Sequence, residues 1–287
     1  MELILDQQAK ADRNIASLGI DRTGLTAELE DLEPPWVETL RFLRSDDGVI
    51  TGAILADWSV EARRAWIHGP WIHADGDVWL GLGTILVEAV TSQLPAVIER
   101  STVIAAVEHR GMADLAVRLG WSPTEVNHVL IADFETINAW TSTETARLRS
   151  MTPEDVADLG PIHDLEFPKT YYSAGDLASR SSRGEQIVLI AERDDGSFAG
   201  YIAGQIQPDG DGYIDFLAVS PSARRTGIGM GLVVAMCQQL VSRSSTQRVC
   251  LTVQDGRAPA RRLYESLGFR YDASIVGFES MVPLVTR

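Results

Sequence analysis

Cysteine is scarce in this chain, because only Cys237 and Cys250 occur among its 287 residues. Two cysteines can build neither a disulfide framework nor the repeated spacing of a metal site. Both lie in apolar segments, which favours buried thiols over reactive ones. We therefore expect no metal and a reducing, cytoplasmic environment.

Long apolar runs and an excess of positive charge are also lacking. No segment approaches the roughly 18 uninterrupted apolar residues of a membrane span, and the opening MELILD has no basic region ahead of an apolar core, so we expect no signal peptide and no membrane partner. Lysine and arginine number 25 against 40 aspartates and glutamates, which gives a net charge of −15 at pH 7. This charge argues against a nucleic-acid partner and weakly favours a cationic substrate such as an amine.

The most informative stretch that is present is VSPSARRTGIGMG, residues 219–231. The segment before it, 212–218, is rich in β-branched and aromatic residues and predicts a strand. The apolar run after it, 232–241, predicts a helix. Glycines let backbone N–H groups approach a ligand, a helix N-terminus adds partial positive charge, and arginines supply forked donors. The stretch is therefore typical of an anion-binding turn.

Three phosphate-binding patterns can be compared with this stretch. A Walker loop needs Gly-Lys-Ser/Thr, and a dinucleotide fingerprint needs G-x-G-x-x-G, whereas the glycines here are spaced G-x-G-x-G. Arg224, Gly227 and Gly229 instead match R-x-x-G-x-G, with Val219 and Pro221 forming the Val-x-Pro before it. This resembles the pyrophosphate loop of the GNAT acyltransferase superfamily. The alternative is a glycine-rich turn with surface arginines.

A second motif is ARRLYESLGF, residues 260–269, which resembles the A-x-x-L-Y-x-x-x-G-F segment of the same superfamily. In many members this tyrosine protonates the departing CoA thiolate, and Tyr264 occupies its position. The alternative is a tyrosine that only packs one face of a helix. The asparagine usual in the family is absent near Gly256 and Arg257.

The resemblance implies acetyl-CoA as cosubstrate and no metal. It also implies that the central strand leaves its neighbour, so that free backbone groups can pair with the pantetheine amides, while the loop holds the diphosphate. The implied cofactor-binding residues are Leu217, Ala218, Val219, Arg224, Arg225, Thr226, Gly227, Ile228, Gly229 and Met230.

The general base is harder to assign. Asp215 is the one carboxylate between Gly212 and Pro221, and an acid inside a strand is disfavoured by propensity, so it is our candidate. It could equally face solvent on a half-exposed strand. Glu166 and Glu192 are weaker candidates. Between the first two helices of this half, Tyr171 and Tyr172 are candidate acceptor contacts, although they could equally pack as a lid.

The two halves of the chain repeat one another. Gly81-x-Gly83 aligns with Gly227-x-Gly229, and Leu-Gly-Trp at 119–121 aligns with Leu-Gly-Phe at 267–269 at a nearly equal offset. We therefore predict an α/β (α+β) chain of two tandem GNAT folds, each with a mixed, mostly antiparallel central sheet flanked by helices. The predicted division is a degenerate N-terminal domain at 1–135, a polar linker at 136–150 and a catalytic domain at 151–287.

The N-terminal half departs from the motifs. In this alignment Val78 and Trp79 replace the two arginines, Ala116 replaces the tyrosine, and Asp75 and Asp77 add negative charge beside the loop. Carboxylates there would repel a diphosphate. We predict that this half is catalytically silent and binds CoA poorly or not at all.

The expected element order follows from periodicity and turn signals. We expect two short helices in 2–31, broken near Gly19 and Gly24, and Thr152 as the cap of a helix from Pro153. The other expected strands are 36–43, 49–58, 65–73, 102–107, 127–134, 186–193, 198–206, 212–220, 247–254 and a closing pair through Pro283. The other expected helices are 79–94 (with Gly81 and Gly83 in its first turn), 112–119, 153–166, 173–183 and 258–267.

Together these features indicate an N-acetyltransferase that moves acetyl from acetyl-CoA directly to a primary amine in a ternary complex. Its two-copy layout resembles that of mycothiol synthases, although no residue singles out their substrate. The alternatives are a protein N-terminal or lysine acetyltransferase and a non-catalytic CoA-binding sensor or scaffold. We expect a small-molecule or peptide amine as partner and a monomer or homodimer.

Overall fold

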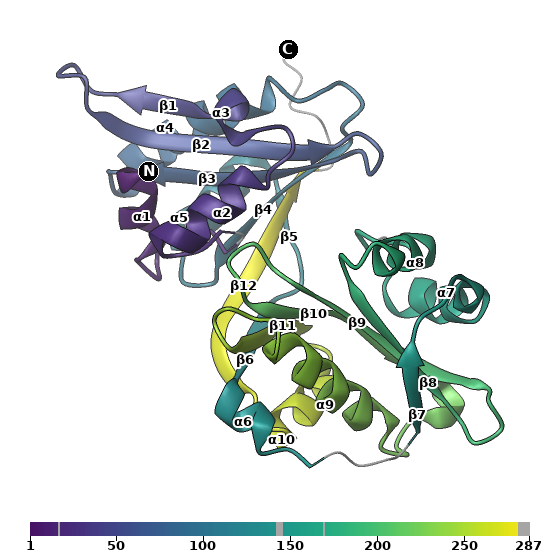
Figure 1. The fold of residues 1–287 in the computed structure, drawn as a ribbon. Coiled ribbons are helices and arrows are strands. Elements are labelled where there is room, and N and C mark those ends of the chain that lie inside the picture. The colour runs from purple at the N-terminus through teal and green to yellow at the C-terminus, as the bar shows by residue number, and fades with distance from the viewer. Residues whose placement is uncertain (17, 142–145, 169, 281–287) are drawn as a thin grey trace. The chain divides into compact units, whose positions relative to one another are not determined.

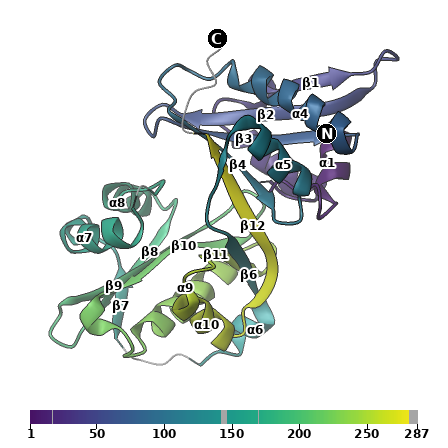
Figure 2. The same cartoon turned by 180° about the vertical axis from the view of Figure 1, so that it is seen from behind.

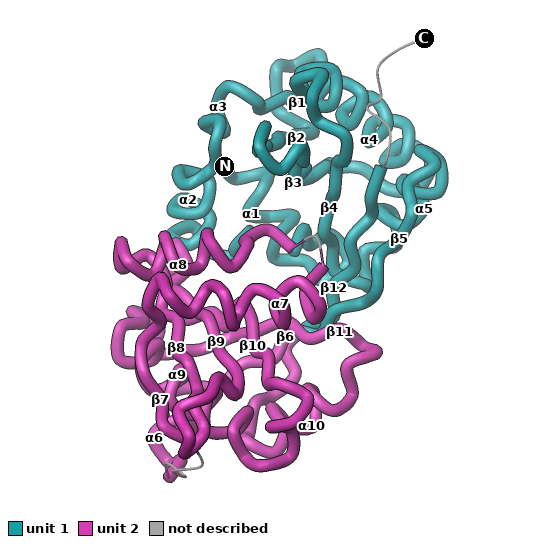
Figure 3. Tube along the Cα trace, turned by 90° about the vertical axis from the view of Figure 1, so that its right-hand side faces the viewer, with its two compact units in different colours: residues 1–128, 273–287 teal, residues 129–272 magenta. Residues whose placement is uncertain are grey.

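The computed structural model describes residues 1–16, 18–141, 146–168 and 170–280, and these form two compact units. Unit 1 contains Met1–His128 and the strand residues that follow Ala273, and unit 2 contains Val129–Asp272 (Figure 3). The sequence placed the end of the first half at residue 135 and kept all residues from 151 onward in the second. The structure instead returns the last strand to unit 1, because residues 275–280 pair with residues 101–106.

Unit 1 is a sheet with helices packed on it (Figure 1). Its first three strands form an antiparallel meander, the fourth is parallel to the third, and the last is antiparallel to the fourth. The strands are β1 (Arg41–Arg44), β2 (Ile50–Ser59), β3 (Arg64–Ile72), β4 (Arg100–Ala106), β5 (Ser122–Pro123) and β12 (Arg270–Ser280). The helices are α1 (Glu2–Gln8), α2 (Arg22–Glu30), α3 (Trp36–Thr39), α4 (Gly76–Thr91) and α5 (Arg110–Leu119).

Unit 2 has the strand order β6-β11-β10-β9-β8-β7, with an antiparallel meander from β7 to β10 and a parallel β10–β11 pair. The strands are β6 (Asn127–Asp133), β7 (Arg147–Ser150), β8 (Ile187–Glu192), β9 (Phe198–Ile206), β10 (Gly212–Val219) and β11 (Arg248–Gln254). The helices are α6 (Phe134–Asn138), η1 (Pro153–Asp155), α7 (Val156–Glu166), α8 (Ala174–Ser182), η2 (Pro221–Ala223), α9 (Ile228–Val241) and α10 (Ala258–Ser266).

The sheet of unit 2 separates two hydrophobic cores. Leu189 of β8 packs in the core under α9, whereas its neighbour Ile190 packs in the core under α7 and α8. Successive residues of a strand point to opposite faces, so one strand supplies both cores. Figures 1 and 2 show α7 and α8 on one face of this sheet and α9 on the other.

Several local expectations need correction. Trp36 begins the short helix α3 rather than a strand, with Pro35 as its N-cap residue, and the strand β1 starts only at Arg41. Gly24 lies inside α2 rather than at a break. The segment 136–150 holds the end of α6 and all of β7, with residues 142–145 outside the described chain, so it is built into unit 2 at both ends. The closing region is one strand to Ser280, and Pro283 lies outside the described residues.

The two units share one plan. In each, an antiparallel meander leads into a parallel strand pair that a long helix connects, α4 in unit 1 and α9 in unit 2. Gly120 and Gly268 end α5 and α10 with left-handed φ values of 72° and 89°, which confirms the Leu-Gly-aromatic repeat. Gly81 and Gly83, however, lie in the second turn of α4 and not at its start, so they do not correspond to Gly227 and Gly229.

Within the described residues, every helix is too short or too polar to cross a membrane.

Candidate active site

In unit 2 the central strands β10 and β11 separate after Ile214. Their pairing runs from Gly212 opposite Val249 to Ile214 opposite Leu251 and then stops. Strand β10 continues to Val219 but remains paired only on its other side, with β9. The backbone groups on the β11 side of residues 215–219 therefore have no strand partner, as the resemblance implied.

Asp215 is a β-bulge at the point where the strands part. Ile214 pairs with Gly204 and Phe216 with Ala203, so Asp215 is an extra residue on β10. A bulge increases local twist and redirects side chains. Ile214 packs in the core under α9, and Phe216 already packs in the core under α7 and α8. The bulge thus changes the face to which the following residues point.

The Asp215 carboxylate is surrounded by three side-chain donors. The Tyr171 hydroxyl donates to Oδ1 at 2.8 Å, the Gln205 Nε2 group donates to Oδ1 at 3.0 Å, and the Gln186 Nε2 group donates to Oδ2 at 2.9 Å. Burial raises the pKa of Asp215 from 3.8 to about 6, although the three hydrogen bonds and Arg180 lower it. A carboxylate with this pKa is ionised at neutral pH and is still basic enough to accept a proton.

The α7–α8 connection holds the two predicted tyrosines in different ways. The Tyr171 ring packs 5.1 Å from the Phe216 ring and places its hydroxyl on Asp215. The Tyr172 carbonyl accepts a 2.7 Å hydrogen bond from Nε2 of buried His163, and the Arg180 guanidinium lies 4.6 Å above the Tyr172 ring. The structure therefore brings Tyr171 together with the predicted base, while Tyr172 anchors the connection.

The loop from β10 to α9 has the features of an anion site. Arg225 and Gly227 adopt left-handed φ values of 63° and 90°, and Gly227 is the N-cap of α9. The Gly231 N–H bonds the Gly227 carbonyl, so the N–H groups of Ile228, Gly229 and Met230 in the first turn have no carbonyl available within the helix. These groups and the helix dipole favour a phosphate.

The two arginines of the loop differ. The Arg224 guanidinium donates to Glu166 Oε1 at 2.6 Å and to the Val219 carbonyl at 3.1 Å. Glu166 also accepts a 2.8 Å hydrogen bond from Arg257, the N-cap residue of α10. Among the described residues the exposed Arg225 side chain makes no hydrogen bond or ion pair. Arg225 is therefore the loop cation that is available to a ligand.

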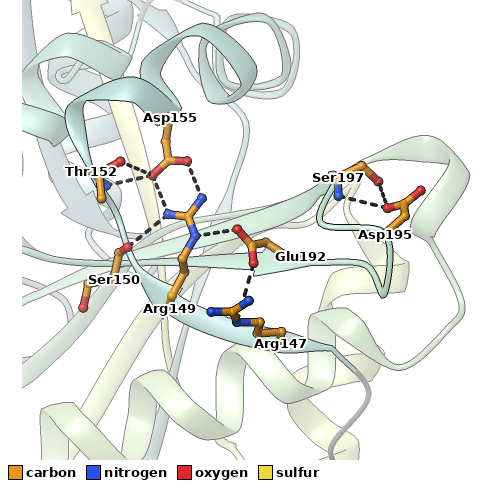
Figure 4. Close-up of polar contacts among 8 residues, drawn as sticks. All are labelled: Arg147, Arg149, Ser150, Thr152, Asp155, Glu192, Asp195 and Ser197. Carbon is orange, nitrogen blue, oxygen red and sulfur yellow. Dashed lines mark hydrogen bonds and ion pairs between the residues drawn. The ribbon is translucent and has the colours of Figure 1, made fainter.

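The weaker base candidates are both engaged by arginines. Glu166 binds Arg224 and Arg257, which together lower its pKa against the effect of burial. Glu192 accepts a 2.5 Å hydrogen bond from Arg149 and lies 3.8 Å from Arg147 (Figure 4). The lowered pKa makes Glu166 a poor proton acceptor, and the Glu192 carboxylate is occupied by its two arginine partners.

Figure 4 also shows how Arg149 joins β7 to the start of the first helical segment. Its guanidinium binds both oxygens of Asp155 at 2.7 Å. Asp155 in turn accepts from the Thr152 backbone N–H, which completes a capping box before Pro153. The predicted helix start at Thr152 is confirmed.

Tyr264 lies on α10 and is 6% exposed, with its ring 5.7 Å from the Phe269 ring in a T-shaped contact. Burial raises the pKa of this phenol well above its usual 10, so it remains protonated at neutral pH. Its hydroxyl has no hydrogen-bond partner among the described residues. A protonated, unpartnered hydroxyl can still donate to a ligand atom.

Sequence reasoning missed Gln186 and Gln205. Neither belongs to a motif, and both lie far from Asp215 along the chain, since Gln186 precedes β8 and Gln205 is on β9. A glutamine in a strand-rich region gives no signal of its partner. The register between β9 and β10 decides which glutamine meets the carboxylate.

In unit 1 the parallel strands β3 and β4 also separate, but an N-terminal segment bonds the edge that this separation exposes. Strands β3 and β4 pair only as far as Ile67 and Val103, and the residues that follow on β3 form a bulge at Gly69-Pro70. The N-terminal segment 14–16 then bonds the free edge of β4, with the Ala16 N–H on the Ile104 carbonyl at 2.9 Å. The Ala106 N–H bonds the Asn14 carbonyl at 3.1 Å.

Gln8 fastens this segment, which we call the N-terminal plug (residues 8–16). Its Oε1 accepts from the Ile15 N–H at 2.8 Å and from Trp71 Nε1 of β3 at 3.1 Å. Its Nε2 donates to the carbonyls of Ile15 and Leu18. The plug therefore joins the two strands that part in unit 1.

The connection from β3 to α4 is also short. It contains only residues 73–75, whereas residues 220–227 connect β10 to α9. The predicted replacement of the arginines by Val78 and Trp79 is therefore wrong, because unit 1 has no segment that corresponds to the loop. Trp79 is a core residue, and Asp75 forms an ion pair with Arg13. Ala116 does correspond to Tyr264, since each lies four residues before its helix-ending glycine.

Among the described residues there is no group of three or more His, Cys, Asp or Glu side chains that could hold a metal ion.

Comparison with known proteins agrees with this geometry. Residues 156–269 match the model of the acetyltransferase (GNAT) family. A mycothiol acetyltransferase of Thermomonospora curvata is 36% identical over 96 residues, which cover 33% of this chain and 32% of that protein. A mycothiol acetyltransferase of Acidothermus cellulolyticus is 44% identical over 73 residues, 25% of this chain and 21% of that protein. The chain thus spans a third or less of the length of these relatives.

Solved structures show the same fold over the whole chain. A GCN5-related N-acetyltransferase from Sphaerobacter thermophilus has a TM-score of 0.70 at 18% identity, covering 99% of this chain and 94% of that one. A tandem GNAT protein from the clavulanic acid biosynthesis pathway has a TM-score of 0.61 at 17% identity, covering 97% of this chain and 94% of that one. The predicted tandem fold is confirmed.

Proposed function

We propose that this chain transfers an acetyl group from acetyl-CoA to a primary amine, because residues 156–269 match the model of the acetyltransferase (GNAT) family. The transfer is direct, within a ternary complex, and takes place in unit 2. The observation that carries the proposal is the separation of β10 from β11 after Ile214. The bulged carboxylate of Asp215 lies at the start of the open strand edge, and the phosphate-type loop follows the end of that edge.

The cosubstrate would lie along this edge. The β11 side of the strand at Leu217, Ala218 and Val219, where the Val219 carbonyl accepts a hydrogen bond from Arg224, suits the amides of pantetheine. A strand N–H can polarise the thioester carbonyl. The diphosphate suits the first-turn N–H groups of α9 and the loop that precedes it. In this proposal Arg225 supplies the full positive charge and Arg224 shapes the loop through Glu166. The remaining loop contacts are Thr226, Gly227, Ile228, Gly229 and Met230.

Two side chains would handle the protons. Asp215 accepts a proton from the acceptor ammonium, and the neutral amine attacks the thioester carbon. Tyr264 donates a hydrogen bond to the departing thiolate, for which its raised pKa keeps it protonated. Substituting Tyr264→Phe is expected to lower kcat by about 10- to 100-fold while leaving the acetyl-CoA Kd within twofold.

The acceptor we propose is a small-molecule amine. The relatives that match part of this chain are mycothiol acetyltransferases, and this match supports a small-molecule amine as the acceptor class. The acidic chain, with its net charge of −15, supports attraction of a cation. Unit 1 takes no part in the chemistry, because it lacks the loop and because the N-terminal plug occupies the free edge of β4.

The test is a calorimetric titration of the full chain with acetyl-CoA, followed by a screen of primary amines for CoA release. We expect one binding site and turnover of at least one amine. Two sites would contradict the assignment of unit 1, and no binding would overturn the proposed function.

A further inference from the structure

Of the three donors around Asp215, only one can pass a proton. The amide groups of Gln186 and Gln205 reach the carboxylate through Nε2, and an amide nitrogen donates but does not accept. The Tyr171 hydroxyl both donates and accepts. Its oxygen keeps lone pairs for a further hydrogen while it donates to Asp215 Oδ1 at 2.8 Å.

The same hydroxyl belongs to the most accessible donor. Tyr171 is 49% exposed, whereas Gln186 is 3% exposed. Oδ1 of Asp215 accepts two hydrogen bonds and Oδ2 accepts one, so this donor shell occupies three of the carboxylate's roughly four lone-pair positions and leaves one on Oδ2, beside the buried Gln186. An acceptor that approaches from solvent reaches this shell at Tyr171.

Tyr171 is held in position by its neighbours. Its ring packs 5.1 Å from Phe216 and 4.8 Å from Tyr172, in a T-shaped contact with the latter. Tyr172 is fixed in turn by the hydrogen bond of its carbonyl to His163 and by the Arg180 guanidinium over its ring. The hydroxyl is therefore placed on Asp215 before any ligand binds, as a proton relay requires.

We propose that Tyr171 is a catalytic residue that relays a proton from the acceptor ammonium to Asp215. An N–H bond of the ammonium breaks and its proton bonds Tyr171 Oη, while the original Tyr171 O–H bond breaks and that proton bonds Asp215 Oδ1. The electron pair stays on nitrogen, which becomes the neutral nucleophile. The relay rests on the proposed function, because it assumes Asp215 as base for amine acetylation.

The phenol does not act as a base by itself. Burial and the adjacent Asp215 charge raise the pKa of Tyr171 far above its ordinary value of 10, so it is not ionised at neutral pH. The two protons must therefore move together. Besides Tyr171, the charged or titratable groups that act on Asp215 are Arg180 of α8 and Tyr213 of β10.

The test is Tyr171→Phe in the full chain, assayed with acetyl-CoA and the best amine of a panel of tyramine, spermidine, glucosamine and an amino-acid ethyl ester. We expect kcat/KM for the amine to fall about 100-fold with the acetyl-CoA Kd unchanged. The rising limb of the wild-type pH profile, near the Asp215 pKa of about 6, should move to higher pH, because the carboxylate loses a stabilising hydrogen bond. The matched control is Tyr271→Phe, which removes a phenol hydroxyl from a residue of β12 that is 59% exposed and should change kcat/KM by less than about twofold.

Hydroxylamine separates a relay from a structural role, because it is already neutral at pH 8 and needs no deprotonation before attack. Tyr171→Phe should acetylate hydroxylamine at close to the wild-type rate, and an equal loss with both nucleophiles would overturn the relay. A curved proton inventory of the wild-type rate in mixtures of H₂O and D₂O is expected for two moving protons, and a linear one would overturn the relay even if the variant misfolds. If Asp215→Asn is inactive while Tyr171→Phe is normal, the relay fails but the base stands. If Asp215→Asn is also normal, or no amine is acetylated, the proposed function fails with it.

Discussion

In both units the parallel strand pair of the sheet separates at the corresponding place, but different segments line the gap between the strands. In each, the parallel strand pair separates after a few residues and a bulge follows at once, at Gly69-Pro70 in unit 1 and at Asp215 in unit 2. In unit 1 the N-terminal plug bonds the free edge, and three residues connect the strand to its helix. In unit 2 no described segment pairs with the β11 side of residues 215–219, and residues 220–227 form the loop.

This difference teaches that the opening is a property of the backbone, whereas the chemistry depends on what lines it. A bulge and a parting of strands need no particular side chain, so both units can keep them. A base, a proton donor and a phosphate loop need specific residues. Unit 1 has Gly-Pro in place of Asp215 and Ala116 in place of Tyr264.

The largest effect is expected from Asp215→Asn, which removes the carboxylate from the bulge of unit 2 and so makes it resemble the bulge of unit 1, where no carboxylate is present. We expect kcat/KM for the amine to fall about 1000-fold at neutral pH, because the base is removed. The matched control is Asp57→Asn in unit 1, whose carboxylate binds His68 at 2.7 Å and should not affect turnover. Steady-state rates of CoA release measure both, and an Asp215→Asn rate within threefold of wild type would contradict the base assignment.

Gln8→Ala would release the N-terminal plug. Gln8 is 1% exposed and its amide satisfies four backbone or indole groups, so the free energy of unfolding should fall by about 3 kcal/mol. Urea denaturation measures this. The calorimetric stoichiometry for acetyl-CoA should stay at one, because unit 1 still lacks the loop. A second site in this variant would mean that the plug alone silences unit 1.

The burial of Asp215 also predicts a cost in stability. Its pKa in the folded state, about 6, lies above its usual value of 3.8, so the folded protein binds this proton more tightly than the unfolded chain does. The contribution of Asp215 to stability should therefore fall as pH rises from about 4 to 6 and then level off. Buried His109, whose pKa is lowered to about 4, contributes with the opposite sign over this range, so the effect of Asp215 is measured as the difference between wild type and variant. Asp215→Asn, in which Gln186 can turn its unpartnered Oε1 toward the new amide, should be more stable than wild type by about 2 kcal/mol at pH 7 and by little at pH 4. Thermal melts at the two pH values test the sign.

The smallest effects are expected from alanine substitutions of Gly81 and Gly227, two glycines that the sequence analysis aligned with one another. Gly81 lies inside α4 with nothing near its missing Cβ, so Gly81→Ala should stabilise the protein by about 0.5–1 kcal/mol. Gly227 has φ 90°, so Gly227→Ala should destabilise it by about 1 kcal/mol and weaken acetyl-CoA binding. Paired urea melts and titrations measure both. Equal effects at the two positions would contradict the structural distinction between them.

Much of unit 2 could be predicted from its sequence because its signals are local. The strand, glycine loop and apolar helix around Gly227 are contiguous, and Thr152 with Pro153 marks a helix start. The environment of Asp215 could not be predicted in the same way. A bulge adds one residue without changing the apolar pattern that marks the strand, and Gln186 meets Asp215 only through the order of β8, β9 and β10.

The errors in unit 1 have a related cause. A glycine inside a helix costs only about 1 kcal/mol, so Gly81 and Gly83 could imitate a loop motif from within α4. The return of the last strand to unit 1 is a long-range pairing, between residues 275–280 and 101–106, and no local pattern reports it. Pairings of this kind depend on tertiary structure rather than on propensity.

The strand β12 has a consequence for the order of events during synthesis. Val276 and Phe278 belong to the core of unit 1, yet they leave the ribosome after every residue of unit 2. Residues 129–272 are contiguous and can fold as soon as they emerge, as domains generally do during translation. Unit 1, although made first, must wait with an unpaired β4 edge until its final strand arrives. A chain released after residue 272 is therefore expected to contain all of unit 2 but to leave unit 1 without its last core strand and protease-sensitive.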